Sequence, residues 1–151
     1  MQTGCTFEEY EIHPLSLDGI DRAKCHEGAV NPDNGNCYLY VGNSITWVLA
    51  DEDCALRGGY LATVSDREEN EFVAALADVP VWIGLSDQDT EGGFRWVTGE
   101  RVEFVNWATN NPYSENELQD CVRLIEGGQW DDSECDSISG RDNAYVCEFD
   151  D

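Results

Sequence analysis

Basic residues are scarce in this chain: eight Lys and Arg stand against 32 Asp and Glu, which gives a formal net charge of −24 at pH 7. A surface of this charge repels phosphate backbones and anionic lipid headgroups, so nucleic-acid binding and membrane-surface binding are disfavoured. Divalent cations and basic partners are attracted instead. Solubility or adaptation to salt accounts equally well for many of the acidic residues, so charge alone does not locate a site.

Long apolar runs are also absent, and no segment could span a bilayer as a helix. We recognise no signal peptide, internal repeat or low-complexity tract, and we expect a mature extracellular domain, secreted or cut from a larger protein. The length of 151 residues suits one domain. Five Trp, six Tyr and five Phe supply large apolar side chains for its core.

The seven cysteines form neither a CxxC pair nor a Cys/His spacing typical of zinc. They therefore predict disulfides and an oxidising compartment. The two histidines, His13 and His26, lie apart in the sequence, and both are expected at the surface.

The amino-terminal part of the chain differs from the rest. Residues 1–24 show little periodicity and are interpreted as an extension, with the domain itself over residues 25–151. Residues 31–36 are a dense turn signal between Cys25 and Cys37. This arrangement suits a hairpin closed by a disulfide.

Two helices are predicted in the first half of the domain. Apolar residues recur at helical spacing over residues 44–57, and Gly58 marks the end of this helix. A capping box from Ser65 to Glu68 predicts the start of the second helix, which Pro80 stops. The apolar stripe of this second helix consists of Phe72, Val73, Leu76 and Ala77.

Short apolar runs predict strands in the remainder of the chain. They lie at residues 37–41, 81–85, 94–97, 102–104, 121–125 and 144–147. Two helices followed by an antiparallel sheet with long loops is an α+β pattern.

Oxygen-bearing side chains concentrate in two segments of the second half. Residues 119–147 carry several between closely spaced cysteines, including Asp131 and Asp132 directly after Trp130. Residues 87–93 form a second acidic segment. Calcium prefers six to eight oxygen ligands from carboxylates, amides and carbonyls. The two segments therefore predict a disulfide-stapled calcium site near the surface.

Several short motifs, taken in order, resemble those of a C-type lectin-like domain. They are Asn36-Cys37-Tyr38, Trp82-Ile83-Gly84-Leu85, Asn106-Trp107, Asp120-Cys121-Val122, Trp130-Asp131-Asp132 and Tyr145-Val146-Cys147-Glu148. Each motif is weak alone, but in this order and spacing they are highly specific over Cys25 to Glu148. The resemblance implies an α+β fold in which two helices accompany antiparallel sheets and a long loop region binds calcium.

The resemblance also implies three disulfides, which spacing alone could not assign. The implied pairs are Cys25–Cys37 in an amino-terminal hairpin, Cys54–Cys147 and Cys121–Cys135. Cys5 is left over, and it could bridge to another chain or an absent domain, or stay a free thiol.

In sugar-binding members of this family, a Glu-Pro-Asn or Gln-Pro-Asp triplet, a later acidic residue and an Asn-Asp pair hold calcium and two sugar hydroxyls. In this chain the matching positions imply calcium ligands at Asn111, Gln119, Asp131 and Asp132. They imply ligand contacts from Asn111, Tyr113, Glu115, Gln119 and Asp131. Pro112 is expected to follow a cis peptide bond.

Four of these positions depart from the family pattern, and at one of them Gln119 replaces a Glu and removes a charge. Asn111 is one carbon shorter than the usual residue, and the neutral phenol of Tyr113 cannot ligate calcium as Asn or Asp would. Asp131 cannot donate to a sugar hydroxyl as Asn would. By contrast, the resemblance implies an auxiliary calcium site at Asp87, Glu91 and Asp120.

We therefore expect a calcium-dependent carbohydrate-binding module, weak at each site and part of a secreted or surface adhesin. One alternative is a scaffold that binds a protein partner without sugar recognition. Another is a module that binds a mineral or ice surface, and the negative charge would suit calcium carbonate. Enzymatic activity is not expected, because no nucleophile, buried general acid or cofactor site accompanies the carboxylates.

Overall fold

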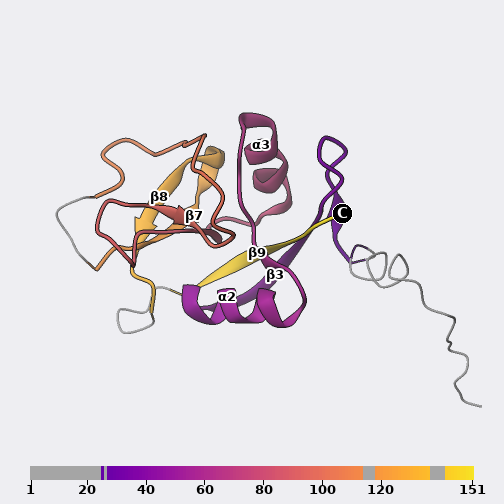
Figure 1. The fold of residues 1–151 in the computed structure, drawn as a ribbon, viewed down its shortest axis with the longest axis horizontal. Coiled ribbons are helices and arrows are strands. Elements are labelled where there is room, and N and C mark those ends of the chain that lie inside the picture. Colours follow the sequence, from indigo (N-terminus) through magenta and orange to yellow (C-terminus); the bar gives the residue numbers. More distant parts are fainter. Residues whose placement is uncertain (1–24, 26, 114–117, 137–141) are drawn as a thin grey trace, which may run out of the picture.

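A mixed eight-stranded sheet organises the part of the chain that the computed structural model describes, which is residues 25, 27–113, 118–136 and 142–151 (Figure 1). The strands are β2 (Ala29–Val30), β3 (Cys37–Ile45), β4 (Tyr60–Leu61), β5 (Val81–Ser86), β6 (Arg95–Trp96), β7 (Cys121–Leu124), β8 (Trp130–Ser133) and β9 (Asn143–Phe149). The helices are α2 (Trp47–Leu56) and α3 (Arg67–Leu76), with a short 3-10 turn η1 (Glu126–Gly128). The predicted α+β class is confirmed.

The strands follow the order β2-β3-β9-β5-β7-β8, while β4 pairs with β9 and β6 pairs with β5. Every pair is antiparallel except β5 and β9, which run parallel. The expectation of purely antiparallel pairing is therefore wrong at this one junction. Apolar runs predict where strands lie but not the direction in which distant strands meet, and parallel neighbours need a long crossover between them.

The two faces of the sheet bury different cores. Val81 and Ile83 of β5 join Val73 of α3 in one cluster, whereas Trp82 joins Trp47 of α2 in the other. Successive side chains of a strand point to opposite faces, which is why Trp82 is separated from its neighbours in sequence. Figure 1 accordingly shows α2 and α3 on opposite sides of β9 and β3.

Both helices begin later than predicted. The cap of α2 is Thr46, whose side chain accepts from the backbone N–H of Leu49, and the expected first residues of this helix belong to β3. Asp66, not Ser65, caps α3 and accepts from the backbone N–H of Glu69 at 2.8 Å. Glu69 reaches back to the N–H of Ser65 at 2.9 Å. The capping box is real but shifted by one residue, because Asp is as good a cap as Ser.

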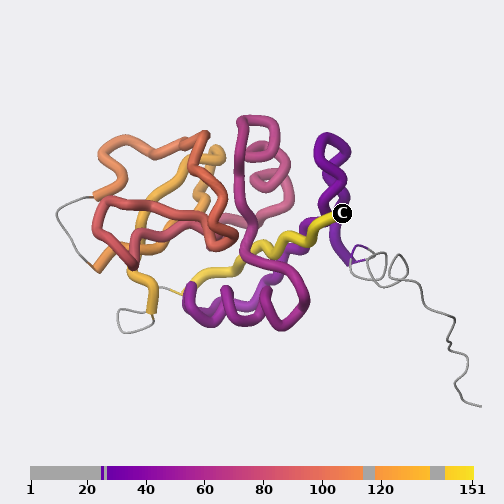
Figure 2. Tube along the Cα trace, viewed as in Figure 1, coloured from indigo at the N-terminus to yellow at the C-terminus, as the bar shows by residue number. Residues whose placement is uncertain are grey.

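A long irregular segment separates β6 from β7 (Figure 2). The predicted strand at residues 102–104 is wrong, because these residues pair with no strand. Phe104 instead packs from the side on the core ring of Trp130, with ring centres 5.9 Å apart. The predicted strand at residues 94–97 is present but shorter, as β6.

The three implied disulfides are confirmed. Cα atoms lie 5.4 Å apart in Cys25–Cys37, 5.4 Å in Cys54–Cys147 and 5.1 Å in Cys121–Cys135. Such crosslinks fit an oxidising compartment. Cys5, His13 and His26 lie outside the described residues. Among the helices of the described part, none is long and apolar enough to cross a membrane.

Candidate functional site

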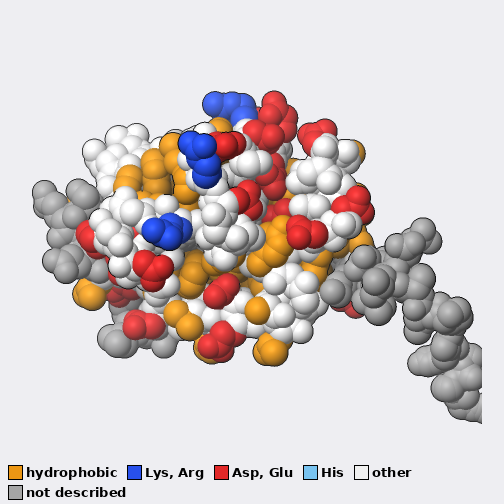
Figure 3. Space-filling view, viewed as in Figure 1, with side chains coloured by type: hydrophobic (Ala, Val, Ile, Leu, Met, Phe, Trp, Pro, Cys, Tyr) orange, Lys and Arg blue, Asp and Glu red, His pale blue; other side chains and the backbone are white. Residues whose placement is uncertain are grey.

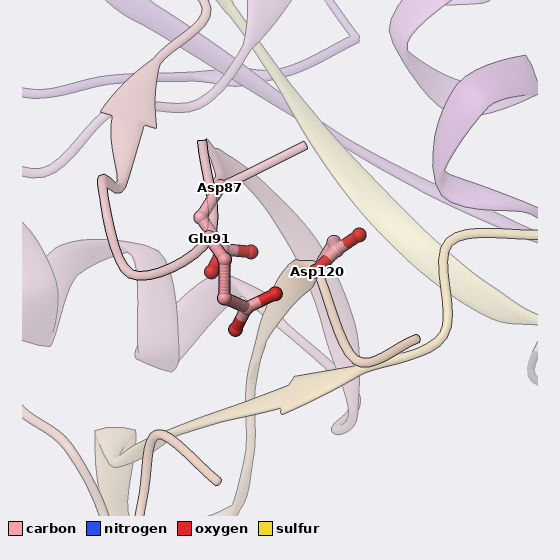
Figure 4. Close-up of side chains that lie close together, drawn as sticks. All are labelled: Asp87, Glu91 and Asp120. Atoms are coloured by element: carbon pink, nitrogen blue, oxygen red, sulfur yellow. The ribbon is translucent and has the colours of Figure 1, made fainter. Parts of the chain in front are cut away.

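Three of the predicted calcium ligands, Asp87, Glu91 and Asp120, come together at one end of the sheet (Figure 4). Each offers a carboxylate oxygen, and these oxygens all lie within 4.8 Å of one another. Asp87 is 2% exposed, Asp120 is partly buried and Glu91 is exposed. The cluster is therefore anchored in the protein on one side and open to solvent on the other.

The ends of two neighbouring strands position this cluster. Asp87 directly follows β5 and Asp120 directly precedes β7, and the backbone N–H of Asp87 donates to the carbonyl of Asp120 at 2.9 Å. The loop after β5 then curls back, and Gly92 N–H donates to Oδ2 of Asp87 at 2.7 Å. Gly92 has a φ of 80°, a conformation that side chains disfavour. This turn brings Glu91 beside Asp87.

Negative charge is concentrated in the cluster. Burial, together with the smaller contributions of the neighbouring Asp87 and Glu91, raises the pKa of Asp120 to about 7. Oδ1 of Asp87 and Oδ1 of Asp120 are both buried, and within the described structure neither has a hydrogen-bond donor. Buried acceptors of this kind are rare and call for a partner. An oxygen-seeking cation such as calcium fits this set of donors.

Gln119 borders the same region. Its Oε1 is a third buried acceptor for which the described residues provide no donor. A hollow of about 220 Å³ lies beside Asp120 and is also lined by Glu134, Asp136 and Leu118. The segment that enters β7 thus carries several oxygen-bearing side chains next to this hollow.

Asp131 and Asp132 point to opposite faces of β8. Trp130 and Asp132 share the face of Val122 and Leu124, whereas Asp131 lies directly across from Arg123 in the neighbouring strand. This is the ordinary alternation of a strand. The structure therefore separates two side chains that the sequence placed in one calcium site.

Asp132 holds the turn that carries the sequence-predicted sugar contacts. Both of its carboxylate oxygens accept from the backbone N–H of Tyr113, at 3.0 and 2.9 Å. Burial raises the pKa of Asp132, while this hydrogen bond lowers it. Asp132 is 5% exposed. Its observed role is to anchor the backbone at Tyr113.

Asp131 is held by an arginine. Arg123 Nε donates to its Oδ1 at 2.7 Å and Nη2 donates to its Oδ2 at 3.2 Å, a two-point contact. Nη1 of the same guanidinium donates to Asn143 at 3.3 Å. The charge of Asp131 is thus already compensated within the protein. Arg123 carries no sequence motif, and only the register of β7 against β8 identifies it as the residue opposite Asp131.

The turn before Tyr113 has a defined shape. Asn110 has a φ of 69°, which Asn tolerates better than most residues, and the peptide bond between Asn111 and Pro112 is cis, as predicted. Asn111 donates from its side chain to the carbonyl of Thr109 at 3.3 Å. Tyr113 is 48% exposed. Glu115 lies outside the described residues.

Trp130 supports this loop region from beneath. It is fully buried, and its Nε1 donates to Asn70 of α3 at 2.8 Å. Its carbonyl accepts from Ala108 N–H at 2.8 Å, and its N–H donates to Asn106 at 2.9 Å. These bonds attach the irregular segment to β8 as a parallel bridge at Trp107. Hydrogen bonds of Trp130 therefore hold the irregular segment against β8 and α3.

Acidic side chains are not confined to this site. In the space-filling view they are spread over the whole visible face, and basic side chains are few (Figure 3). Surface carboxylates alone therefore do not distinguish a site in this protein. Asp87 and Asp120 differ from these surface carboxylates because each has a buried oxygen for which the described residues provide no hydrogen-bond donor.

Comparisons with known proteins agree with this architecture. The family model of the lectin C-type domain matches residues 43–149. The chain is 38% identical to versican core protein of Rattus norvegicus over 104 residues, which are 67% of this chain and 4% of versican. It is 34% identical to asialoglycoprotein receptor 2 of the same species over 122 residues, 76% of this chain and 38% of the receptor.

Among solved structures, human lithostathine superimposes with a TM-score of 0.74 at 30% identity, covering 95% of this chain and 100% of lithostathine. The chain thus corresponds to a small part of the curated relatives and to a whole solved domain. It belongs to the C-type lectin domain family.

Proposed function

We propose that this chain is a calcium-dependent carbohydrate-binding module of a secreted or cell-surface protein. The observation that carries the proposal is the cluster of Asp87, Glu91 and Asp120, in which two carboxylates keep a buried oxygen without a donor in the described structure. Three carboxylates so close together repel one another, and a divalent cation relieves that repulsion.

A bound calcium ion would supply a charge that ties the loop after β5 to the segment before β7. Asp87 and Asp120 lie at the two strand ends, and Glu91 of the loop after β5 brings its carboxylate next to theirs. Three carboxylates provide up to six oxygens, within the range that calcium takes. The open side leaves room for water or a ligand hydroxyl.

We place the carbohydrate contacts on the neighbouring turn, at Asn111, Tyr113 and Gln119, with Glu115 as a further contact. Tyr113 is about half exposed, and Asp132 fixes its backbone. An aromatic ring with a polar tip beside amide groups suits the face and hydroxyls of a sugar. One shallow contact of this kind gives about millimolar affinity, about 4 kcal/mol, so useful binding needs several copies. Cys5 is a candidate for joining them.

The second predicted calcium position has fewer free oxygen ligands. It consists of Asn111, Gln119, Asp131 and Asp132. Asp131 would have to leave Arg123, and Asp132 would have to share its oxygens with the N–H of Tyr113. We therefore assign the principal ion to Asp87, Glu91 and Asp120. A second ion at the turn requires rearrangement of both aspartates.

Glycan binding measured with and without a chelator tests the proposal. Binding on a glycan array should require calcium and should be lost in the Asp120→Asn variant. Asp89→Asn is the matched control, because Asp89 lies in the same loop but outside the cluster. Glycan binding that survives chelation would reject the calcium-dependent mechanism.

The second candidate is a scaffold that binds a protein partner, or a mineral or ice surface, without sugar recognition. The observation that favours it is that Asp131 and Asp132 are already satisfied by Arg123 and by the backbone of Tyr113. Absence of calcium heat in calorimetry, together with an empty glycan array, would support this candidate.

A further inference from the structure

A second hollow lies between α2 and the hairpin of β5 and β6, next to the loop that carries Asp87 and Glu91. Its volume is about 460 Å³, within the usual range of small-molecule sites. Trp47 and Asp51 line it from α2, and Ser86, Asp89 and Arg95 line it from the hairpin. None of these residues belongs to the site described above.

The walls of this hollow are firmly held. Trp47 Nε1 donates to the carbonyl of Ile83 at 2.8 Å, which fixes the start of α2 against β5. Val97 N–H donates to the carbonyl of Gly84 at 2.8 Å, which fixes the hairpin to the same strand. Asp51 follows Trp47 by one helical turn and therefore lies on the same side of α2. The hollow is thus a preformed feature between two anchored elements.

Charges of opposite sign line the hollow without pairing. Asp51, Asp89 and Arg95 form no side-chain hydrogen bond or ion pair with any other residue of the described structure. The other ion pairs of the described chain, at Arg57 and Arg123, show that arginines here do pair where a carboxylate is in reach. Asp51 and Arg95 are therefore held apart on different elements.

Of these three charged groups, Asp51 loses the most hydration, because Asp89 and Arg95 are exposed. It is partly buried, and burial raises its pKa, with a smaller contribution from the charge of Glu52. A desolvated carboxylate beside another carboxylate gains most from a cationic group. A cation alone would face the guanidinium of Arg95, however, and an anion alone would face Asp51 and Asp89.

We propose that the hollow between α2 and the β5–β6 hairpin binds a small zwitterionic ligand, whose ammonium pairs with Asp51 and Asp89 and whose carboxylate pairs with Arg95. An ammonium donates up to three hydrogen bonds, and two carboxylates can accept them. A guanidinium binds a carboxylate through two parallel bonds. Ser86 and Thr98 add neutral groups that both donate and accept.

A titration of the full chain with ω-amino acids tests this proposal. Glycine, γ-aminobutyrate and ε-aminocaproate separate the two charges by increasing distances, while butylamine and butyrate carry one charge each. Amide and indole N–H shifts are followed by NMR at neutral pH, once in a chelator and once with calcium, so an effect of the calcium site is told apart from binding in the hollow. Trp47 lines the hollow, so its indole N–H, which is bonded to the carbonyl of Ile83, serves as a reporter for binding there.

One zwitterion should bind about tenfold or more tightly than butylamine and butyrate, with shifts at Trp47 and around Arg95. Arg95→Gln and Asp51→Asn should each weaken it about tenfold. Arg101→Gln is the matched control, because Arg101 is also exposed and lies outside the hollow. Its affinity should equal that of the parent chain.

Three results would overturn the proposal. One is the absence of saturable shifts at Trp47 with every probe. Another is butylamine binding as tightly as the best zwitterion, which would leave Arg95 without a role. The third is an equal effect of Arg95→Gln and Arg101→Gln. The spectrum of each variant shows whether it is folded, so loss of binding is not confused with loss of structure.

Discussion

Asp87 and Asp120 meet at the ends of β5 and β7, where one backbone hydrogen bond joins them and each keeps a buried oxygen for which the described structure provides no donor. In a protein whose acidic residues are spread over the surface, this pair is distinguished by its burial and its unsatisfied acceptors. A cation would satisfy both oxygens at once and would join two strand ends.

Calcium should raise the melting temperature of the parent chain. At about ten to a hundred times the dissociation constant, a ligand that binds only the folded state stabilises it by about 1.4–2.7 kcal/mol. For a domain of this size the rise is roughly 3–11 °C. The Asp120→Asn and Asp87→Asn variants should lose this rise, because each removes a charged ligand. Differential scanning calorimetry with and without calcium measures it.

Asp89→Asn should keep the full calcium response, since Asp89 lies in the same loop but not in the cluster. The same loss of response in Asp89→Asn and Asp120→Asn would mean that general surface charge, rather than the cluster, holds the ion.

The stability of the calcium-free protein should fall as pH rises. The pKa of Asp120 is raised to about 7 in the folded state, above its ordinary value of about 4, so its protonated form is favoured by folding. This contribution is fully present below about pH 4 and is lost as pH rises through about 7. Denaturant unfolding in a chelator, compared between the parent chain and Asp120→Asn, measures it. Identical pH profiles for the two proteins would contradict the assigned pKa.

Asp131→Asn should weaken the fold without changing the calcium response. The substitution removes a charge-assisted contact with Arg123 that is mostly shielded from solvent, and we expect a loss of about 1–3 kcal/mol in the free energy of unfolding. Urea unfolding gives this loss, and calorimetry gives the calcium response of the same variant. If Asp131→Asn abolished the response, Asp131 would be a calcium ligand despite its contact with Arg123.

Asp132→Ala should impair glycan binding while keeping the calcium-induced rise in melting temperature. The carboxylate of Asp132 anchors the N–H of Tyr113, and its removal frees the turn that carries Asn111 and Tyr113. We expect a loss of about tenfold in affinity. Asp132→Asn keeps one acceptor and should lose less. Equal binding by the parent chain and both variants would show that this turn does not contact the glycan.

Much of the fold could be predicted from the sequence because its markers are local. The turn between Cys25 and Cys37, the glycines that follow α2 and the acidic cap of α3 each act within a few residues. Even there the predicted cap, Ser65, differs from the observed cap, Asp66, because both residue types can accept a backbone N–H at the start of a helix. The order of the cysteine-bearing motifs was sufficient for the three disulfides once the family resemblance was recognised.

The candidate site was predictable only in part, because it depends on contacts between distant segments. Asp87, Glu91 and Asp120 could be grouped from the family resemblance, and the structure brings them together. The separation of Asp131 from Asp132 follows from strand alternation, and the partner of Asp131 follows from the register of β7 and β8. No local sequence pattern predicts the register of β7 against β8 or the parallel pairing of β5 with β9.

A crystal structure of the protein grown with calcium tests the central claim most directly. The account predicts one ion coordinated by oxygens of Asp87, Glu91 and Asp120 at about 2.3–2.6 Å. Only water between these three carboxylates, at a calcium concentration well above millimolar, would contradict it.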